Sequence, residues 1–156
     1  MRCILFIGHF TKKMMNENPY YPTKKIGDVL TSTIISNNLK QKYPNSKIDF
    51  LCHSNCAAVL KENPNIDSII EFPINERESH RSLLEYMFKI RQQKYDAVID
   101  VYSKLGTNLI TLFSGAKLKI SYHKWYSTLF YNHNLMRFNG KKTTEYGLQL
   151  TIDYCC

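Results

Sequence analysis

Residues Ile26–Lys40 read IGDVLTSTIISNNLK, and the run Cys3–Ile7, CILFI, precedes them in the chain. The earlier run is continuously apolar, as buried strands of parallel sheets are. The later stretch carries apolar residues at helical spacing, with Asp28 at the expected start of the helix. Open α/β sheets bind ligands beyond the carboxyl ends of their strands, in front of helix N-termini. We therefore expect Asp28 to lie at the ligand-binding edge of such a sheet.

Strand-like and helix-like patterns alternate along the whole chain, which is typical of a parallel sheet flanked by helices. The predicted strands are Arg2–Gly8, Lys47–Cys52, Ser68–Phe72, Ala97–Val101 and Leu118–Ser121. The predicted helices are Val29–Tyr43, Ala57–Glu62, Ser79–Gln93 and Leu105–Phe113, with Thr144–Tyr154 as a closing helix. With right-handed crossovers, these elements predict an α/β fold. It is a Rossmann-like three-layer sandwich with strand order 3-2-1-4-5.

The bulk properties are those of one soluble domain over residues 1–156, with 44% hydrophobic and 22% charged residues. A formal charge of +8 favours anionic partners. The lysines are scattered, however, so an ordinary solvated surface explains them equally well. No apolar stretch approaches the roughly 20 residues of a membrane span. Five cysteines without scaffold-like spacing fit a reducing compartment, and the cytoplasm is the expected location.

Several segments in a fixed order resemble a known family. They are Ile26–Leu30, Leu39–Pro44, Ile48–Leu51, Asn63–Ile70, Lys94–Asp100 and Leu112–Lys117. In this order and at these spacings the chain resembles the amino-terminal half of glycosyltransferase family 9, the ADP-heptose:lipopolysaccharide heptosyltransferases. The resemblance spans essentially the whole chain, and its specificity lies in the ordered set rather than in any single motif.

The resemblance implies a GT-B architecture of two Rossmann-like domains, of which the first binds the acceptor sugar and the second binds the nucleotide-sugar. It implies that Asp28 is the catalytic base, which removes a proton from an acceptor hydroxyl during an inverting displacement at the anomeric carbon. A base of this kind must lie within hydrogen-bond reach of that hydroxyl. It implies no metal and no cofactor. The residues expected to line the acceptor pocket are Gly27, Lys24, Lys25, His9 and Ser103.

The residues taken alone leave other interpretations open. Without the resemblance, Asp28 is better explained as the cap of the helix N-terminus than as a base. Gly27 is equally well explained by a tight turn. Lys24 and Lys25 are candidates for contact with acceptor phosphate, but a solvated pair fits as well. The polar segment His9–Thr23 is longer than the family's usual connection. Loops of this length at the carboxyl edge of a sheet are more often functional than idle. We expect the segment either to reshape the acceptor pocket or to indicate an acceptor other than the family's usual heptose-Kdo core.

The sequence ends at Cys156, where the donor-binding half of the family begins. We therefore expect the C-terminal donor domain to be absent and the chain to be inactive alone, because alignment of the anomeric carbon needs that domain. The implied partners are an ADP-heptose-like nucleotide-sugar, held by a missing or separate domain, and a phosphorylated glycan or lipid acceptor. Peripheral contact with the inner membrane is left open. The alternative is a non-catalytic α/β module or remnant that binds a protein or an anionic surface.

Two other patterns, a cysteine-containing segment and an aromatic segment, predict no functional site. The segment Cys52–Cys56, CHSNC, lacks the second ligand pair of a structural zinc site, so its cysteines are expected to be small buried hydrophobes. The aromatic segment Tyr122–Tyr131 could stack on single-stranded nucleic acid. Its basic residues do not interleave along one element, which favours core or interface residues, so no nucleic-acid partner is expected.

Overall fold

The computed structural model describes residues 1–6, 23–72, 80–101, 103–122 and 129–135. The strands are β1 Arg2–Phe6, β2 Lys47–His53, β3 Ser68–Phe72, β4 Ala97–Asp100, β5 Leu118–Tyr122 and β6 His133–Leu135. The helices are α1 Thr23–Lys42, α2 Ser54–Leu60, α3 His80–Gln92 and α4 Leu105–Phe113. The predicted closing helix Thr144–Tyr154 lies outside the described residues.

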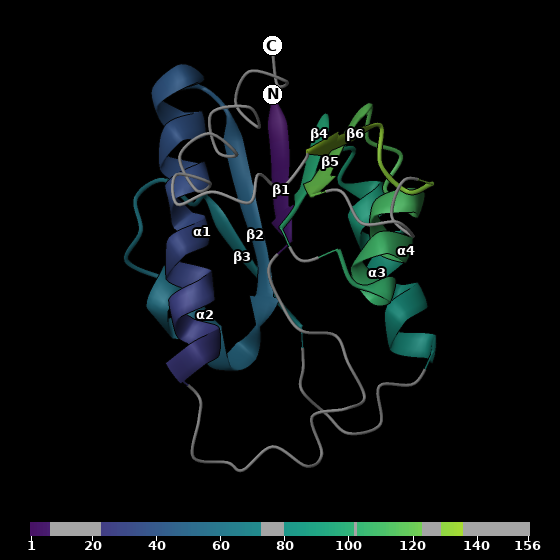
Figure 1. The fold of residues 1–156 in the computed structure, drawn as a ribbon, viewed down its shortest axis with the longest axis horizontal. Coiled ribbons are helices and arrows are strands. Elements are labelled where there is room, and N and C mark those ends of the chain that lie inside the picture. Colours follow the sequence, from purple (N-terminus) through teal and green to yellow (C-terminus); the bar gives the residue numbers. More distant parts are fainter. Residues whose placement is uncertain (7–22, 73–79, 102, 123–128, 136–156) are drawn as a thin grey trace.

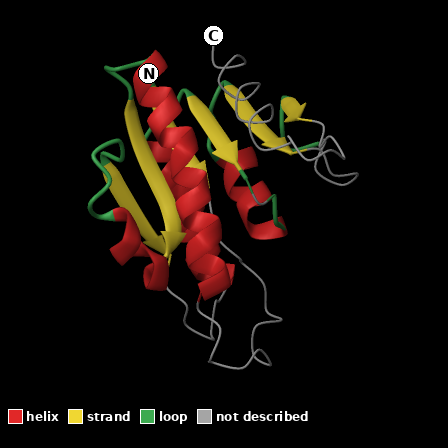
Figure 2. Cartoon of the chain, turned by 60° about the vertical axis from the view of Figure 1, so that its left-hand side comes forward, coloured by secondary structure: helices red, strands yellow, loops and turns green. Residues whose placement is uncertain are grey.

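The strands form one sheet in the order β3-β2-β1-β4-β5-β6, with every neighbouring pair parallel. Figure 1 shows α1 and α2 on one face of this sheet and α3 and α4 on the other. In Figure 2 the strands, in yellow, lie side by side among the helices, in red. The Rossmann-like three-layer sandwich and its central strand order are therefore confirmed. β6 at the edge of the sheet was not predicted, because its three residues include His133 and Asn134 and carry no apolar alternation.

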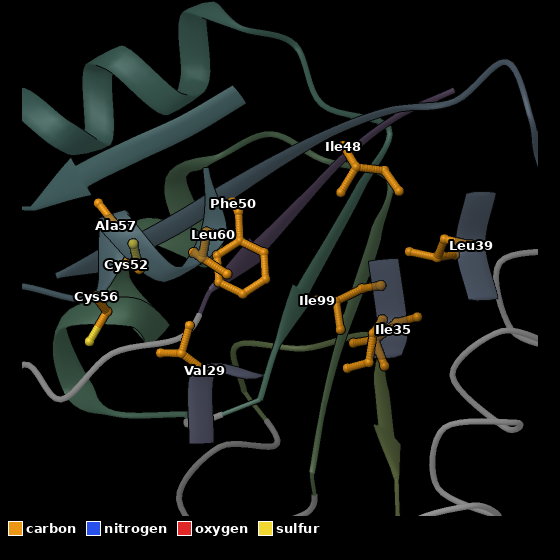
Figure 3. Packing of buried hydrophobic residues seen from close by; sticks show 11 residues of the cluster. Val29, Ile35, Leu39, Ile48, Phe50, Cys52, Cys56, Ala57, Leu60 and Ile99 are labelled. Atoms are coloured by element: carbon orange, nitrogen blue, oxygen red, sulfur yellow. The ribbon is translucent and has the colours of Figure 1, made fainter. Parts of the chain in front are cut away.

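Two hydrophobic clusters fill the space between the sheet and its helices. Along β2, Ile48, Phe50 and Cys52 belong to the cluster that includes residues of α1 and α2, whereas Leu51 belongs to the cluster on the other face. This split follows from the two-residue period of a strand, which sends successive side chains to opposite faces. Figure 3 shows Phe50 in the midst of the first cluster, close to Leu60 and Val29.

Helix α1 is longer than predicted, since it begins at Thr23 and not at Val29. A helix boundary was expected at Gly27-Asp28 because glycine is unfavourable inside helices and aspartate favours caps. In the structure Gly27 is exposed, and apart from its own helix backbone no atom of the described residues lies within 4 Å of the position that a Cβ would take. The glycine is therefore an ordinary helical residue, and the interpretation of Asp28 as an N-cap is wrong.

The amino edge of the sheet carries a buried carboxylate with its own counter-charge. Asp49 forms an ion pair with Arg2 at 3.1 Å and accepts a hydrogen bond from the Tyr95 hydroxyl at 2.6 Å. Burial raises the pKa of the Tyr95 hydroxyl, and the hydrogen bond to Asp49 raises it further. These contacts tie the start of β1 to β2 and to the turn that leads into β4.

Truncation of Phe50 tests the importance of the first cluster. Phe50 is fully buried, so Phe50→Ala should lower the free energy of unfolding by about 3–5 kcal/mol through lost burial and the remaining cavity. Equilibrium unfolding in urea measures this change. The matched control is Phe88→Ala, because Phe88 is exposed on α3. Its effect should stay within about 0.5 kcal/mol. Equal losses for the two variants would contradict the described core.

Candidate functional site

The candidate site lies where the strand order reverses. β1 pairs with β2 on one side and with β4 on the other, and Phe6 at the end of β1 is in register with Asp100 at the end of β4. The connections β1–α1 and β4–α4 therefore leave the carboxyl edge from neighbouring strands. In open parallel sheets this reversal is the position at which ligands bind.

The β1–α1 side of the site carries most of the predicted site residues. Lys24 and Lys25 lie in the first turn of α1, Gly27 is exposed, and Asp28 is the sixth residue of the helix. For Lys24, Lys25 and Asp28 the structure describes the backbone only. His9 lies outside the described residues. The roles predicted for these residues therefore stay predictions, but four of them share one end of one helix.

The β4–α4 side of the site is built on a buried carboxylate. Asp100 is fully buried, and its two oxygens accept hydrogen bonds from the Ser103 backbone N–H and from the Tyr131 hydroxyl, each at 2.7 Å. The Ser121 hydroxyl donates to the Asp100 carbonyl at 2.8 Å. Asn108 of α4 contacts both the Ser103 and the Tyr131 hydroxyls through its side-chain amide. We call Asp100, Ser103, Asn108 and Tyr131 the β4–α4 network.

Hydrogen-bond chemistry sets the direction of the bonds in this network. A phenol has one proton, and the carboxylate of Asp100 is the stronger acceptor for it. The Oδ1 of Asn108 lies 2.7 Å from the same phenol oxygen and is the second acceptor within reach of its one proton. Burial raises the pKa of the Tyr131 hydroxyl, and the negative charge of Asp100 raises it further. Tyr131 therefore remains a proton donor to Asp100.

Ser103 was predicted to line the acceptor pocket. It does lie at the carboxyl edge, but its side chain is buried and bonded within the network. Its φ of 48° is in the left-handed region, which is uncommon for a residue with a side chain. The bond from its N–H to Asp100 holds this conformation. The prediction that Ser103 contacts an acceptor stays a prediction, and the structure assigns it a role in shaping the turn before α4.

No role in a site was predicted for Asp100 or Asn108, and Tyr131 was interpreted only as one of the aromatic core or interface residues, which agrees with its burial. A signal was present, because Thr107, Asn108 and Thr111 interrupt the apolar helix Leu105–Phe113 and all three are buried. Polar side chains on the buried face of a helix need hydrogen-bond partners. Such a pattern after a strand that ends in aspartate predicts a polar network at the edge of the sheet.

The segment Cys52–Cys56 is part of the core. Both cysteines are buried in the first hydrophobic cluster, which confirms their interpretation as small hydrophobes. Burial raises the pKa of the Cys52 thiol to about 12, and Cys56 and Glu71 add to this effect. Thiols in this protonated state are poor metal ligands. Among the described residues no three histidine, cysteine or acidic side chains are grouped as a metal site.

Two curated proteins are similar to the chain in sequence. Lipopolysaccharide heptosyltransferase 3 of Escherichia coli strain K12 is 30% identical over 100 residues, which is 61% of this chain and 28% of that protein. A second Escherichia coli protein of the same name is 28% identical over 102 residues. The resemblance to glycosyltransferase family 9 is confirmed. No family model matches the chain.

Solved structures of family 9 share the fold. The family 9 glycosyl transferase from Veillonella parvula superposes with a TM-score of 0.76 at 18% identity, over 98% of this chain and 41% of that one. The Escherichia coli heptosyltransferase WaaC with ADP gives 0.72 at 18% identity, over 99% and 46% of the two chains. At this identity the likeness concerns the fold alone. The chain spans less than a third of the length of the curated relatives it matches.

Removal of one hydroxyl tests the β4–α4 network. Tyr131→Phe leaves the ring in place but withdraws the donor from the buried Asp100 carboxylate. The free energy of unfolding should therefore fall by about 1–3 kcal/mol, as measured by urea denaturation. The control is Tyr86→Phe, which removes an exposed bond to the Glu71 carbonyl. This variant should lose less than about 1 kcal/mol. A Tyr131→Phe variant as stable as the wild type would contradict the network.

Proposed function

We propose that the chain is the acceptor-binding domain of a glycosyltransferase of the heptosyltransferase type. The observation that carries this proposal is the sequence similarity to two proteins named lipopolysaccharide heptosyltransferase 3. The family 9 fold over nearly the whole chain supports it. The acceptor is a lipopolysaccharide-type or related surface glycan, and the reaction takes place in the cytoplasm, as the family resemblance implies.

Asp28 is the catalytic base in this proposal. Its position in the second turn of α1, beside the reversal of the strand order, supports the assignment. The carboxylate takes the proton of an acceptor hydroxyl while the oxygen forms a bond to the anomeric carbon of the donor. The bond from that carbon to the nucleoside diphosphate breaks, and the diphosphate leaves with the electron pair. Attack opposite to the leaving group inverts the configuration.

Lys24 and Lys25 bind a phosphate of the acceptor in this proposal. Two cations in the first turn of a helix are unfavourable, because the helix N-terminus itself is electropositive. An anion bound at this end would interact with both lysines and with the free backbone N–H groups of the first turn. The unfavourable placement of these lysines in α1 is thus explained if a phosphorylated ligand binds there.

The nucleotide-sugar binds to residues outside this chain. The short coverage of the curated relatives supports this part of the proposal. A second domain, in the same polypeptide or in a separate chain, would hold the donor and present its anomeric carbon to the acceptor. The chain alone should accordingly bind acceptor but neither bind nor turn over ADP-heptose.

The base assignment is tested in the presence of the donor-binding domain. Asp28→Asn should lower kcat by about 10²–10⁴-fold, with little change in the KM for acceptor, because it removes only proton transfer. Glu62→Gln, at an exposed carboxylate after α2, is the control and should keep full activity. Transfer rates measured with ADP-heptose and lipopolysaccharide core acceptor decide the matter. An unchanged kcat for Asp28→Asn would exclude this residue as the base.

The phosphate contact is tested with the chain alone. The double variant Lys24→Gln, Lys25→Gln should weaken binding of a phosphorylated core oligosaccharide by about tenfold or more in calorimetric titration at low salt. The control is Lys42→Gln, Lys61→Gln, which removes two charges away from the first turn of α1. Equal weakening of binding by both pairs of substitutions would indicate a general charge effect.

If the chain shows neither acceptor binding nor turnover with a donor domain, the alternative of a non-catalytic module replaces the transferase.

A further inference from the structure

The outer surface of α3 and α4 is unusually apolar for a solvent-exposed face. Figure 1 shows the two helices next to each other on one side of the sheet, and they contact each other. Phe88 is 65% exposed and Leu105 is 70% exposed. We call the exposed apolar residues of the two helices the α3–α4 face: Leu84, Phe88, Leu105, Leu112 and Phe113.

These residues are not part of the domain core. The inner sides of the same helices already fill the second hydrophobic cluster, through Met87 and Ile90 of α3 and Ile110 of α4. The ends of the two helices are joined, because Arg91, one turn after Phe88, donates to the Phe113 carbonyl at 3.2 Å. Five large apolar side chains exposed on two helices that contact each other mark a candidate interaction site, whereas single exposed apolar residues do not.

The same two helices and the residues next to them carry an excess of basic residues. The cations with described side chains there are Lys89, Arg91, Lys94, Lys104 before α4, Lys117, and Lys119 at the start of β5. The exposed acidic residues over the same described segments are Glu85 and Asp96. Lys119 donates to the Leu112 carbonyl at 3.1 Å, so it stands with Arg91 at the end of α4. Burial lowers the pKa of Lys119, and the nearby Arg91 guanidinium lowers it further.

We propose that the α3–α4 face docks the domain onto an anionic lipid surface. Aromatic and aliphatic side chains enter the boundary between headgroups and acyl chains, while lysine and arginine remain with the headgroups. Each cation near an anionic leaflet strengthens the attraction, and the net charge of +8 acts in the same direction. This charge complementarity favours a membrane over an apolar protein partner, which would have no need of the surrounding cations.

Docking by this face would leave the candidate site open. Both helices begin at the carboxyl edge of the sheet and run toward its amino edge, so the face follows the side of the domain. Leu105, at its near end, is two residues after Ser103 of the β4–α4 network. The apolar surface therefore begins next to the candidate site. The proposal rests on the proposed function for the acceptor, since a glycan carried by a lipid is held at such a surface.

Vesicle flotation of the complete chain tests the proposal without sugar transfer. The chain should float with vesicles of phosphatidylglycerol and phosphatidylcholine, and less so as salt increases. It should not float with phosphatidylcholine alone. Phe88→Gln with Phe113→Gln should weaken partitioning about tenfold or more through lost apolar burial. The side chain of Phe113 is dispensable for the bond from Arg91, which ends on the backbone carbonyl.

Two matched variants distinguish binding through the α3–α4 face from non-specific binding of the protein to vesicles. Leu30→Gln with Ile34→Gln changes two exposed apolar residues of α1, on the opposite face of the sheet, and should leave flotation unchanged. Lys89→Gln with Lys117→Gln should weaken it roughly fivefold for each charge removed, whereas Lys42→Gln with Lys61→Gln should have a smaller effect. Thermal melting followed by circular dichroism verifies that each variant folds.

Three outcomes would overturn the proposal: no flotation of the wild type, equal losses for the α1 pair, or wild-type flotation of the phenylalanine pair. Sedimentation equilibrium tests a second copy as the occupant. If the wild type forms a dimer and does not bind vesicles, and the Phe88→Gln, Phe113→Gln variant is a monomer, the α3–α4 face is a self-association surface. Flotation without glycosyl transfer would refute only the proposed activity, and transfer without flotation only the docking surface.

Discussion

The pairing of β1 with β2 on one side and β4 on the other is the constraint on which the structure depends. It gives the central strand two parallel neighbours, so both faces of the sheet need helices and the strands themselves become buried. It also brings two connections, far apart in the sequence, to adjacent positions at one edge. The candidate site exists because of this pairing, since β1, which precedes α1 in the chain, and β4, which leads into the turn before α4, end side by side.

Two buried carboxylates lie at opposite edges of the sheet and have different surroundings. Asp49 faces the guanidinium of Arg2 and closes the amino edge. Asp100 accepts hydrogen bonds from a backbone N–H and a phenol, and the loop it organises borders the candidate site. A carboxylate held by such donors fixes the course of the backbone, because each donor has one required direction. The carboxyl edge is thus shaped by directional bonds.

The fold could be predicted from the sequence because local and long-range signals agree. Ser68–Phe72 and Leu105–Phe113 have the predicted bounds, since turn residues flank both apolar segments. The start of α1 could not be predicted, because local propensity opposes a glycine inside a helix and only the structure shows that nothing crowds it. β6 was missed because its stability comes from pairing with β5 rather than from its own residues.

The candidate site was predictable only in part, since its residues come from different segments. The residues of α1 are close in sequence, and their common location followed from one helix. The β4–α4 network joins Asp100 to Tyr131 across 31 positions. No helical or strand periodicity in the sequence indicates a contact between residues so far apart. Asn108 offered a local hint, as a polar residue within an apolar helix, but its partners Ser103 and Tyr131 come from the turn before α4 and from the segment before β6.

Through its hydrogen bonds, Tyr131 connects the turn before α4 to the edge strand of the sheet. It precedes β6, a strand of three residues with a single neighbour. Short outer strands open more readily than central ones, through local fluctuations that leave the rest of the domain folded. Each opening of β6 would draw the phenol away from Asp100 and free the backbone at Ser103. Fraying of β6 and rearrangement of the turn after β4, two strands away in the order β4-β5-β6, are therefore one cooperative event. Amide hydrogen exchange would register this coupling as shared protection.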